Sequence, residues 1–594
     1  MKNIALAFSG GGFRAAAFSL GTLSYLNKAQ YNNIPLLHNV KFIGSASGGS
    51  ITNLAYSLSI AQGKSFDDFY FELMDAMEGE KLIAKAFEIL KDNSYWKTRA
   101  HKNRNLINAF AIAYDEMLFN KVEFGALNNT YNAGNCHIEQ VCVNATEFAN
   151  GLSFRFQSKH KNPDAGSGLL GNHFINISDD TIANKIKLGD ILASSSCFPG
   201  GFEPLIYPDD FMHEKLDTKE LTDALNYRDN PFTNEINPED IGNAKEPKDQ
   251  KQFALMDGGI ADNQAIGSVN LAAKRNKDNP FDLLLITDVS SYFINAYSTP
   301  KQVRIPLGKY SVRQIGFTTA LLLLLFIVTV LAGIILKLEW LKTVLLIVAV
   351  IIPILFILPK FRYLFKQKAN EEDGTWKLMV LNYGRYFLQL PLNALLLMLF
   401  TRLKSVFLMT TDIYLKQIRR KYYEQLFEDA SSPETVVANA IYDLSRIKDK
   451  VASKKIEEDV KDELGYDPEN PDKKPKNNLP APSPIIRYVA EEARKAATTL
   501  WFDPYQQKAM LKEIIVATGQ FTTCYNLLKH LKKRKNLPTD DTQAIAQLQL
   551  QLEKDWNNFN KDPFWLFNEG QKNRQEPLVL SVIKTGADYK VVKS

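Results

Sequence analysis

The segment that most constrains the fold is residues 40–58, where an apolar run passes through a cluster of very small residues into a helical pattern. Residues 40–43 predict a strand, and residues 51–58 predict a helix. A strand that turns sharply into a helix, with a serine at the apex, is a nucleophile elbow, and crowding at the turn requires small neighbours. The segment therefore predicts an α/β fold that presents a serine hydroxyl at the end of a strand.

The pattern Gly-x-Ser-x-Gly fits this turn in two registers. If it begins at Gly44, Ala46 occupies the apex, and the apex has no hydroxyl. If it begins at Ser45, Ser47 occupies the apex and Gly49 closes the pattern. Serine is nearly as small as the glycine it replaces, so we favour Ser47. Taken alone, the segment also fits an ordinary turn rich in serine and glycine.

A second strand-to-helix turn lies near the N-terminus. Apolar residues 4–8 precede Gly10, Gly11 and Gly12, and residues 15–26 have the composition of a buried helix. Free backbone N–H groups at a helix N-terminus suit an anion, either a phosphate or the oxyanion of an acyl-transfer intermediate. The spacing matches neither the Rossmann nor the Walker pattern. We expect oxyanion donors here, with a plain tight turn as the alternative.

A base for the serine is expected among the carboxylates, because none of the seven histidines lies in a motif-like setting. Asp257 follows apolar residues 253–256 and precedes Gly258 and Gly259. An acid at the end of a buried strand is held in place, and a carboxylate within hydrogen-bond reach can take a serine proton. The alternative is a turn aspartate that accepts backbone hydrogen bonds.

Taken together, these blocks resemble the patatin-like phospholipase family in its bacterial form. The similarity covers about residues 1–295, and its blocks are 8–14, 45–50, 193–202 and 257–259, with further likeness at 144–146 and 283–288. The resemblance implies a three-layer αβα fold with a central, mostly parallel sheet. It also implies an enzyme that cleaves fatty-acyl esters of phospholipids and uses no cofactor.

The resemblance assigns roles to individual residues. Ser47 would attack the ester carbonyl, and Asp257 would take the serine proton in a Ser–Asp dyad without histidine. The N–H groups of residues 10–12 would hold the oxyanion. Arg14 stands where the family has a basic residue, so it is expected to brace the loop or to attract phosphate. Ser45 departs from the family by replacing the first glycine of the elbow.

Charge and cysteine content argue against a nucleic-acid-binding protein, a disulfide-rich protein and a metalloprotein. The net charge of +5 is small for 594 residues and is spread along the chain, which does not favour nucleic acid as a partner. Four cysteines form no dense framework, as expected for free thiols in a reducing compartment. Cys136, His137 and Cys142 could ligate a metal, but no second ligand pair follows at zinc spacing. We expect no metal site.

A long apolar region predicts a membrane segment. Residues 315–336 carry no charge and residues 341–358 are largely apolar, which predicts a helical hairpin in a bilayer. Two buried core helices are the alternative. Lysines and arginines flank both ends, so the positive-inside rule places the catalytic region and both termini in the cytoplasm. The resemblance to the bacterial form of the family implies that the membrane is a bacterial inner membrane. Residues 386–408 predict an interfacial helix, with a third spanning helix as the alternative.

These patterns divide the chain into five parts. We expect a catalytic domain (1–300), a membrane region (301–410), a juxtamembrane helical region (411–463), a proline-rich linker (464–484) and C-terminal helices that pack back on the catalytic domain (485–594). Residues 207–251 are polar and predict a surface loop within the catalytic domain.

The functional hypothesis is a membrane-anchored serine acyl hydrolase that acts on phospholipid in the adjoining bilayer. The membrane helices also offer a surface for homo-oligomerisation. Three alternatives remain at this point: a catalytically inactive scaffold or regulatory protein, a transporter subunit, and a hydrolase for thioesters or neutral lipids.

Overall fold

The computed structural model builds its central sheet around β1 (Ile4–Phe8), which pairs in parallel with β4 (Val40–Ala46) on one side and β12 (Leu283–Asp288) on the other. β5 (Gln140–Glu147) adds to β4, and β13 (Val436–Ala440) adds to β12, both in parallel. These five strands form the parallel centre. The antiparallel flank beyond β5 consists of β6 (Leu152–Gln157), β7 (Leu170–Gly171), β8 (Ile175–Ile177), β10 (Leu225–Tyr227), β11 (Phe253–Asp257) and β9 (Leu205–Tyr207).

The structure describes residues 1–593 with gaps. The gaps are 79, 133–135, 149–150, 160–169, 173, 178, 228–251, 291–307, 322–323, 325–388, 429–434, 446–478, 498–500, 534–541, 573, 575 and 587.

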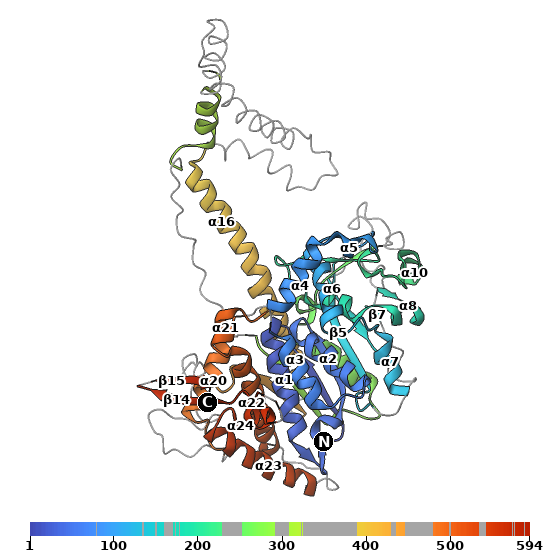
Figure 1. The fold of residues 1–594 in the computed structure, drawn as a ribbon, viewed down its shortest axis with the longest axis vertical. Coiled ribbons are helices and arrows are strands. Elements are labelled where there is room, and N and C mark those ends of the chain that lie inside the picture. The colour runs from blue at the N-terminus through green and yellow to red at the C-terminus, as the bar shows by residue number, and fades with distance from the viewer. Residues whose placement is uncertain are drawn as a thin grey trace. The chain divides into compact units, whose positions relative to one another are not determined.

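Alternation along β1 places helices on both faces of the sheet. Ile4, Leu6 and Phe8 belong to one buried core, whereas Ala5 and Ala7 belong to a second core on the opposite face. The first core is covered by α1 (Gly12–Lys28), α2 (Gly48–Ala61) and α22 (Leu511–Lys533) (Figure 1). The second core is covered by α12 (Ile266–Arg275) and α17 (Leu415–Glu428). The predicted three-layer α/β fold is confirmed, and its sheet is mixed.

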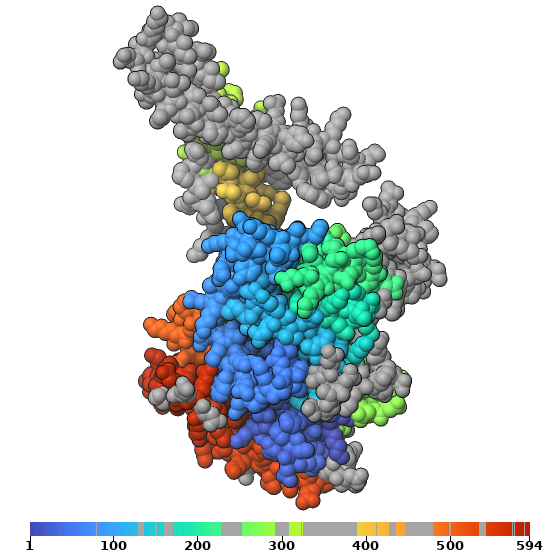
Figure 2. All heavy atoms as spheres, turned by 45° about the vertical axis from the view of Figure 1, so that its right-hand side comes forward, coloured from blue at the N-terminus to red at the C-terminus, as the bar shows by residue number. Residues whose placement is uncertain are grey.

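The C-terminal helices share the core of the N-terminal half. α22 crosses α1 so closely that a Cβ on Gly519 would lie 2.3 Å from the carbonyl oxygen of Phe18, and one on Gly21 would lie 2.1 Å from that of Val516. α23 (Thr542–Lys561) buries Trp556 in the same core. In Figure 2 the orange and red C-terminal segment lies against the blue N-terminal segment.

One strand lies where only helices were expected. Residues 411–463 include α17, but they also include β13, whose Val436 and Val437 are buried against β12. The run Val-Val-Ala-Asn-Ala favours a strand because β-branched residues fit a pleated, buried surface. Because charged residues lie on both sides of this short run, its strand pattern was not recognised in the sequence.

A buried ion pair joins β12 to α17. Arg419 Nε donates to Asp288 Oδ2 at 2.6 Å, and the two side chains are 4% and 0% exposed. Arg419 also donates to the hydroxyl of Tyr442, and the hydroxyl of Tyr423 donates to Asp288 Oδ2 at 3.2 Å. These bonds fix α17 against the end of β12, just before the chain re-enters the sheet as β13.

The polar stretch predicted as a loop at 207–251 contains regular structure in its first part. α10 (Thr218–Asp223) and β10 follow β9, and β10 pairs with β8. Phe211, Leu216 and Leu221 are buried, and these spaced apolar residues are sufficient to anchor the segment. The loop prediction is therefore wrong for this part, and residues 228–251 lie outside the described residues.

The chain separates into two compact units, 1–294 together with 411–594, and 295–410. Most of the predicted hairpin, 315–336 and 341–358, lies outside the described residues. In the part of the second unit that is described, α16 (Leu392–Leu408) begins after Pro391 and exposes Leu403, Val406 and Phe407. No helix within the described residues is both long and apolar enough to cross a bilayer.

Candidate active site

The turn between β4 and α2 places Ser47 at its apex. β4 ends at Ala46, Ser47 has φ 49° and ψ −124°, and α2 begins at Gly48. A Cβ on Gly48 would lie 2.0 Å from the carbonyl oxygen of Gly12, and one on Gly49 would lie 2.6 Å from that of Phe8. Small residues are therefore required after the apex. The register that begins at Ser45 is the one the chain adopts.

Ser47 and Asp257 come together across the sheet. The hydroxyl of Ser47 donates to Asp257 Oδ2 at 2.8 Å. Asp257 is the last residue of β11, and its other oxygen accepts the N–H of Gly259 at 2.7 Å. Both side chains are buried, at 9% exposed for Ser47 and 6% for Asp257. The pair has the geometry of a nucleophile and its base.

Burial controls the charge of Asp257. Loss of hydration raises the pKa of this carboxyl to about 6, while the hydrogen bonds from Gly259 and Ser47 act in the opposite direction. The carboxylate form, which is able to take a proton, therefore predominates above about pH 6.

The glycine loop supplies fewer free donors than the sequence predicts. The N–H of Gly10 donates to the carbonyl of Asn263 at 2.9 Å and is therefore occupied. Gly11 and Gly12 have φ values of +140° and +60°, which glycine adopts readily. Within the described residues no acceptor takes the N–H of Gly11 or of Gly12. Two of the three predicted donors thus remain for an anion.

Arg14 lies beneath this loop. Its guanidinium donates to the carbonyl of Ala496 at 2.6 Å and to that of Val289 at 2.9 Å. Burial lowers the pKa of Arg14 to about 10, against the opposing charge of Asp288. These two contacts favour the bracing alternative for Arg14 over the attraction of phosphate.

Ser45 lies under the elbow and away from the reacting groups. Its hydroxyl accepts hydrogen bonds from Asn53 Nδ2 at 2.8 Å and from Ser50 Oγ at 3.0 Å. The residue is fully buried. A serine in the first position of the motif is therefore accommodated by a polar network beneath the turn.

Two residues that bond to the elbow or to the glycine loop were not singled out as site residues from the sequence. Ser195, at the end of α9 (Leu188–Ser196), accepts the N–H of Ser47 at 2.9 Å. Asn263 accepts the N–H of Gly10 and donates its side-chain N–H to Ser290 Oγ at 3.1 Å. Ser195 lies within the block 193–202 that carries the family resemblance, and this block is the signal that could have indicated it.

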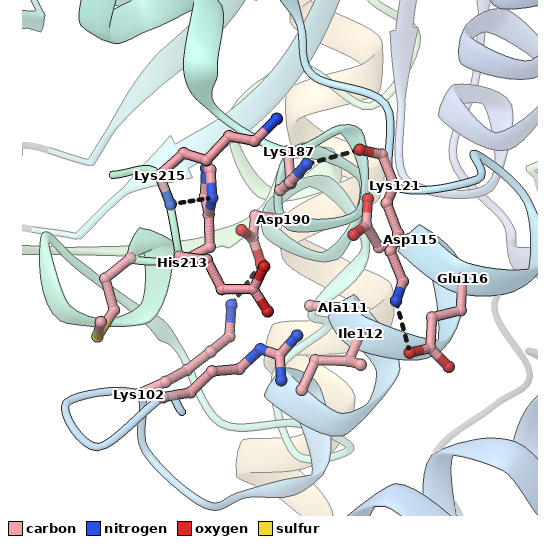
Figure 3. Close-up of a pocket in the computed structure, with 13 residues that line it drawn as sticks. Lys102, Ala111, Ile112, Asp115, Glu116, Lys121, Lys187, Asp190, His213 and Lys215 are labelled. Atoms are coloured by element: carbon pink, nitrogen blue, oxygen red, sulfur yellow. Dashed lines mark hydrogen bonds and ion pairs between the residues drawn. The ribbon is translucent and has the colours of Figure 1, made fainter. Parts of the chain in front are cut away.

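A separate cavity of about 90 Å³ is lined by none of the predicted site residues (Figure 3). Side chains of both charges surround it. Lys102 Nζ pairs with Asp190 Oδ1 at 2.5 Å. Burial, together with the nearby charge of Asp190, raises the pKa of Asp115 to about 7. Because neither Ser47, Asp257 nor the glycine loop lines this cavity, we assign it no part in the chemistry at Ser47.

The possible metal ligands Cys136, His137 and Cys142 do not form a site. Cys142 is buried in β5, and the ring of His137 lies against His38 at 5.1 Å between centroids. The described residues contain no group of three or more His, Cys, Asp or Glu side chains placed to hold a metal ion.

Part of the sequence matches the model of a known protein family. Residues 6–269 match the family model described as Patatin-like phospholipase, which is less than half of the 594 residues. The chain contains a patatin-like phospholipase domain. The predicted family resemblance is confirmed for these residues, and at the level of the family it supports a lipid acyl hydrolase. Both members of the Ser47–Asp257 pair lie within the patatin-like domain.

Solved structures similar to this chain include human GIVD cytosolic phospholipase A2, with a TM-score of 0.31, 12% identity, and coverage of 49% of this chain and 43% of that chain. The same human protein in complex with methyl gamma-linolenyl fluorophosphonate gives a TM-score of 0.25 at 12% identity, covering 48% of this chain and 40% of the other. This chain therefore spans less than half the length of these proteins. A search of curated proteins found no match.

Proposed function

We propose that this chain is a serine acyl hydrolase that releases fatty acid from phospholipid through a dyad of Ser47 and Asp257. The observation that carries the proposal is the 2.8 Å hydrogen bond from the hydroxyl of Ser47, at the apex of a strained turn, to a buried carboxylate. A patatin-like domain over residues 6–269 supports the choice of a lipid ester as substrate.

The proposed reaction assigns each of these groups one step. Asp257 takes the proton of Ser47 as the serine oxygen bonds to the acyl carbon, and the N–H groups of Gly11 and Gly12 bind the oxyanion. The ester C–O bond then breaks, and the departing lysolipid alcohol receives the proton from Asp257. Water attacks the acyl-enzyme, Asp257 takes a proton from that water, and Ser47 regains a proton as the fatty acid leaves.

The test is fatty-acid release from phospholipid vesicles by wild type, Ser47→Ala and Asp257→Asn. We expect both variants to lose at least about 1,000-fold in rate, because removal of a nucleophile or its base leaves only binding and the oxyanion donors. Ser194→Ala is the matched control, since its buried hydroxyl bonds within α9, to the carbonyl of Asp190 at 2.7 Å. Release at the wild-type rate by Ser47→Ala would exclude the dyad.

The alternative of a catalytically inactive scaffold rests on one feature, the missing first glycine of the elbow motif. It loses support because the turn presents a serine rather than Ala46 at the apex. Covalent labelling of Ser47 by a fluorophosphonate separates the two hypotheses, since a scaffold has no activated hydroxyl to label.

We further propose that residues 315–358 anchor the enzyme in a bilayer, with the patatin-like domain on the cytoplasmic side. The support is the uncharged run 315–336 in the sequence and the exposed apolar side chains of α16. Carbonate extraction of membranes tests the anchor: the full chain should stay in the pellet, and a chain lacking 315–358 should be released. Oligomerisation through these residues stays a prediction.

A further inference from the structure

Three consecutive serines end α9, and only the middle one faces the elbow. The hydroxyls of Ser194 and Ser196 each donate to the carbonyl four residues earlier, Asp190 and Leu192, at 2.7 Å. These bonds stay inside the helix. The hydroxyl of Ser195 leaves the helix and donates to the carbonyl of Asn144 on β5 at 2.7 Å. All three residues are buried.

The same Ser195 oxygen accepts the backbone N–H of Ser47 at 2.9 Å. With φ 49° and ψ −124°, Ser47 has a backbone conformation that L-residues rarely adopt. Such a conformation persists only when the surrounding structure determines it. On the C-terminal side of the apex, the carbonyl of Ser47 accepts the N–H of Ser50 at 2.9 Å. On the N-terminal side, Ser195 supplies the corresponding restraint through a side chain.

Ser195 also holds the segment that carries the base. Its carbonyl accepts the N–H of Gly258 at 3.1 Å, and Gly258 directly follows Asp257. A Cβ on Gly258 would lie 2.1 Å from the carbonyl oxygen of Asn144, so this segment fits tightly against the same carbonyl that Ser195 contacts. Ser195 is therefore bonded to Ser47 through its hydroxyl and to the residue after Asp257 through its carbonyl.

We propose that Ser195 is a positioning residue for the reaction: its hydroxyl sets the apex of the elbow at hydrogen-bonding distance from Asp257. This inference rests on the proposed function, because it assigns Ser195 a part in the reaction of Ser47. It also implies that the N–H of Ser47 is occupied and makes no contact with the oxyanion, which leaves that task to the glycine loop.

The test is the rate at which a fluorophosphonate labels Ser47 in the full-length protein, followed by mass spectrometry of the labelled peptide. For Ser195→Ala we expect the second-order labelling rate to fall about 10- to 100-fold, because small misplacements of a reacting group have effects of this size. The final extent of labelling should equal that of wild type. Ser194→Ala removes a neighbouring buried hydroxyl that bonds only within its helix, and it should label at the wild-type rate.

This readout separates positioning from loss of folded protein. A fraction that is irreversibly misfolded lowers the final extent of labelling, whereas a mispositioned serine in folded protein labels slowly to the full extent; a denaturant melt of each variant measures any reversible loss of folded protein. If Ser195→Ala fails to fold, Ser195→Cys retains the shape with a weaker acceptor, and we expect an intermediate rate at full extent. The fatty-acid release of Ser195→Ala should show a lower kcat with an unchanged KM.

The proposal is overturned if Ser195→Ala, or Ser195→Cys in its place, labels at the wild-type rate. It is equally overturned if Ser194→Ala slows labelling as much as Ser195→Ala does. Failure of the proposed function has a different signature: wild type is labelled at Ser47 but releases no fatty acid from phospholipid. In that case the labelling rates still decide the role of Ser195. A wild type that is not labelled at all would overturn both.

Discussion

At the scale of single residues, the site depends on two arrangements that are unfavourable by themselves. Ser47 has a strained backbone, and Asp257 holds a carboxylate where water hardly reaches it. The N–H of Ser47 donates to the hydroxyl of Ser195, and Asp257 accepts the N–H of Gly259, so hydrogen bonds offset each arrangement. Both costs fall on groups that the proposed reaction uses, as is common at functional sites.

The first prediction concerns the pH dependence of the rate. Because the pKa of Asp257 is about 6, the rate should rise about tenfold per pH unit below pH 6 and level off above it. Below this pKa the carboxyl is protonated and cannot take the proton of Ser47. The measurement is kcat/KM for a soluble, uncharged ester between about pH 4.5 and 8.5. A flat profile down to the lowest pH would contradict Asp257 as the base.

The second prediction concerns stability. A carboxyl whose pKa is higher in the folded state, about 6, than its ordinary value of 3.8 makes the fold less stable as pH rises between these values. Asp257→Asn removes this penalty and keeps the shape, so above pH 6 it should raise the free energy of unfolding by up to about 3 kcal/mol. Denaturant melts of both proteins measure this difference, which should shrink towards pH 4. An equal difference at both pH values would assign the gain to another cause.

The sequence located the proposed reacting pair because each member is marked by local chemistry. Small residues flank Ser47, and two glycines follow Asp257. The occupied N–H of Gly10 was not predictable, because its acceptor, Asn263, comes from a distant part of the chain. The distinct role of Ser195 among three serines depends on how α9 is rotated against the sheet, and packing decides that rotation.

At the scale of elements, local patterns predicted the strands that carry the site. Apolar residues 4–8 form β1, and residues 253–256 form most of β11. The crossing of α1 and α22 was not predictable in detail, because it depends on two glycines whose spacing in the sequence carries no periodic signal. Gly21 and Gly519 bring the two helix backbones into contact.

The third prediction tests this crossing. In an open helix, Gly→Ala favours folding by about 0.5–1 kcal/mol. At Gly519 the added methyl would lie 2.3 Å from the carbonyl oxygen of Phe18, so Gly519→Ala should instead lower the free energy of unfolding by about 1–3 kcal/mol. Gly570, in α24 (Trp565–Gln571), has open space around it and is the matched control. Urea denaturation compares the two; a stabilised Gly519→Ala would show that the helices can move apart freely.

At the scale of the whole molecule, one folding unit is built from two separated stretches of chain, 1–294 and 411–594. The family match ends at residue 269, yet the core beneath α1 is completed by Phe521 and Trp556. The sequence predicted that the C-terminal helices return to the catalytic domain, but not that β13 extends its sheet. The matched segment is therefore only part of the fold.

The fourth prediction follows from this division. A fragment of residues 1–294 should not fold on its own, because it lacks β13 and the helix that covers α1. Co-expression with residues 411–594 should restore a soluble complex, since the two pieces share one buried core. Size-exclusion chromatography and fluorophosphonate labelling of Ser47 measure the result. A soluble, monomeric and labelled 1–294 fragment would show that the C-terminal part is dispensable.

The buried ion pair of Asp288 and Arg419 affects which part of the chain can vary in length and sequence. The strand β12 ends at Asp288 shortly before the second unit begins, and Arg419, shortly after that unit ends, pairs with Asp288, so both ends of the inserted segment are held by contacts within the first unit. Lengthening a connection costs little, about 0.6 kcal/mol for each doubling. Replacing residues 295–410 with another segment should therefore leave the contacts at both of its ends in place. A segment of another length or composition is therefore tolerated there, by evolution or by design, while the sheet that carries Ser47 and Asp257 stays the same.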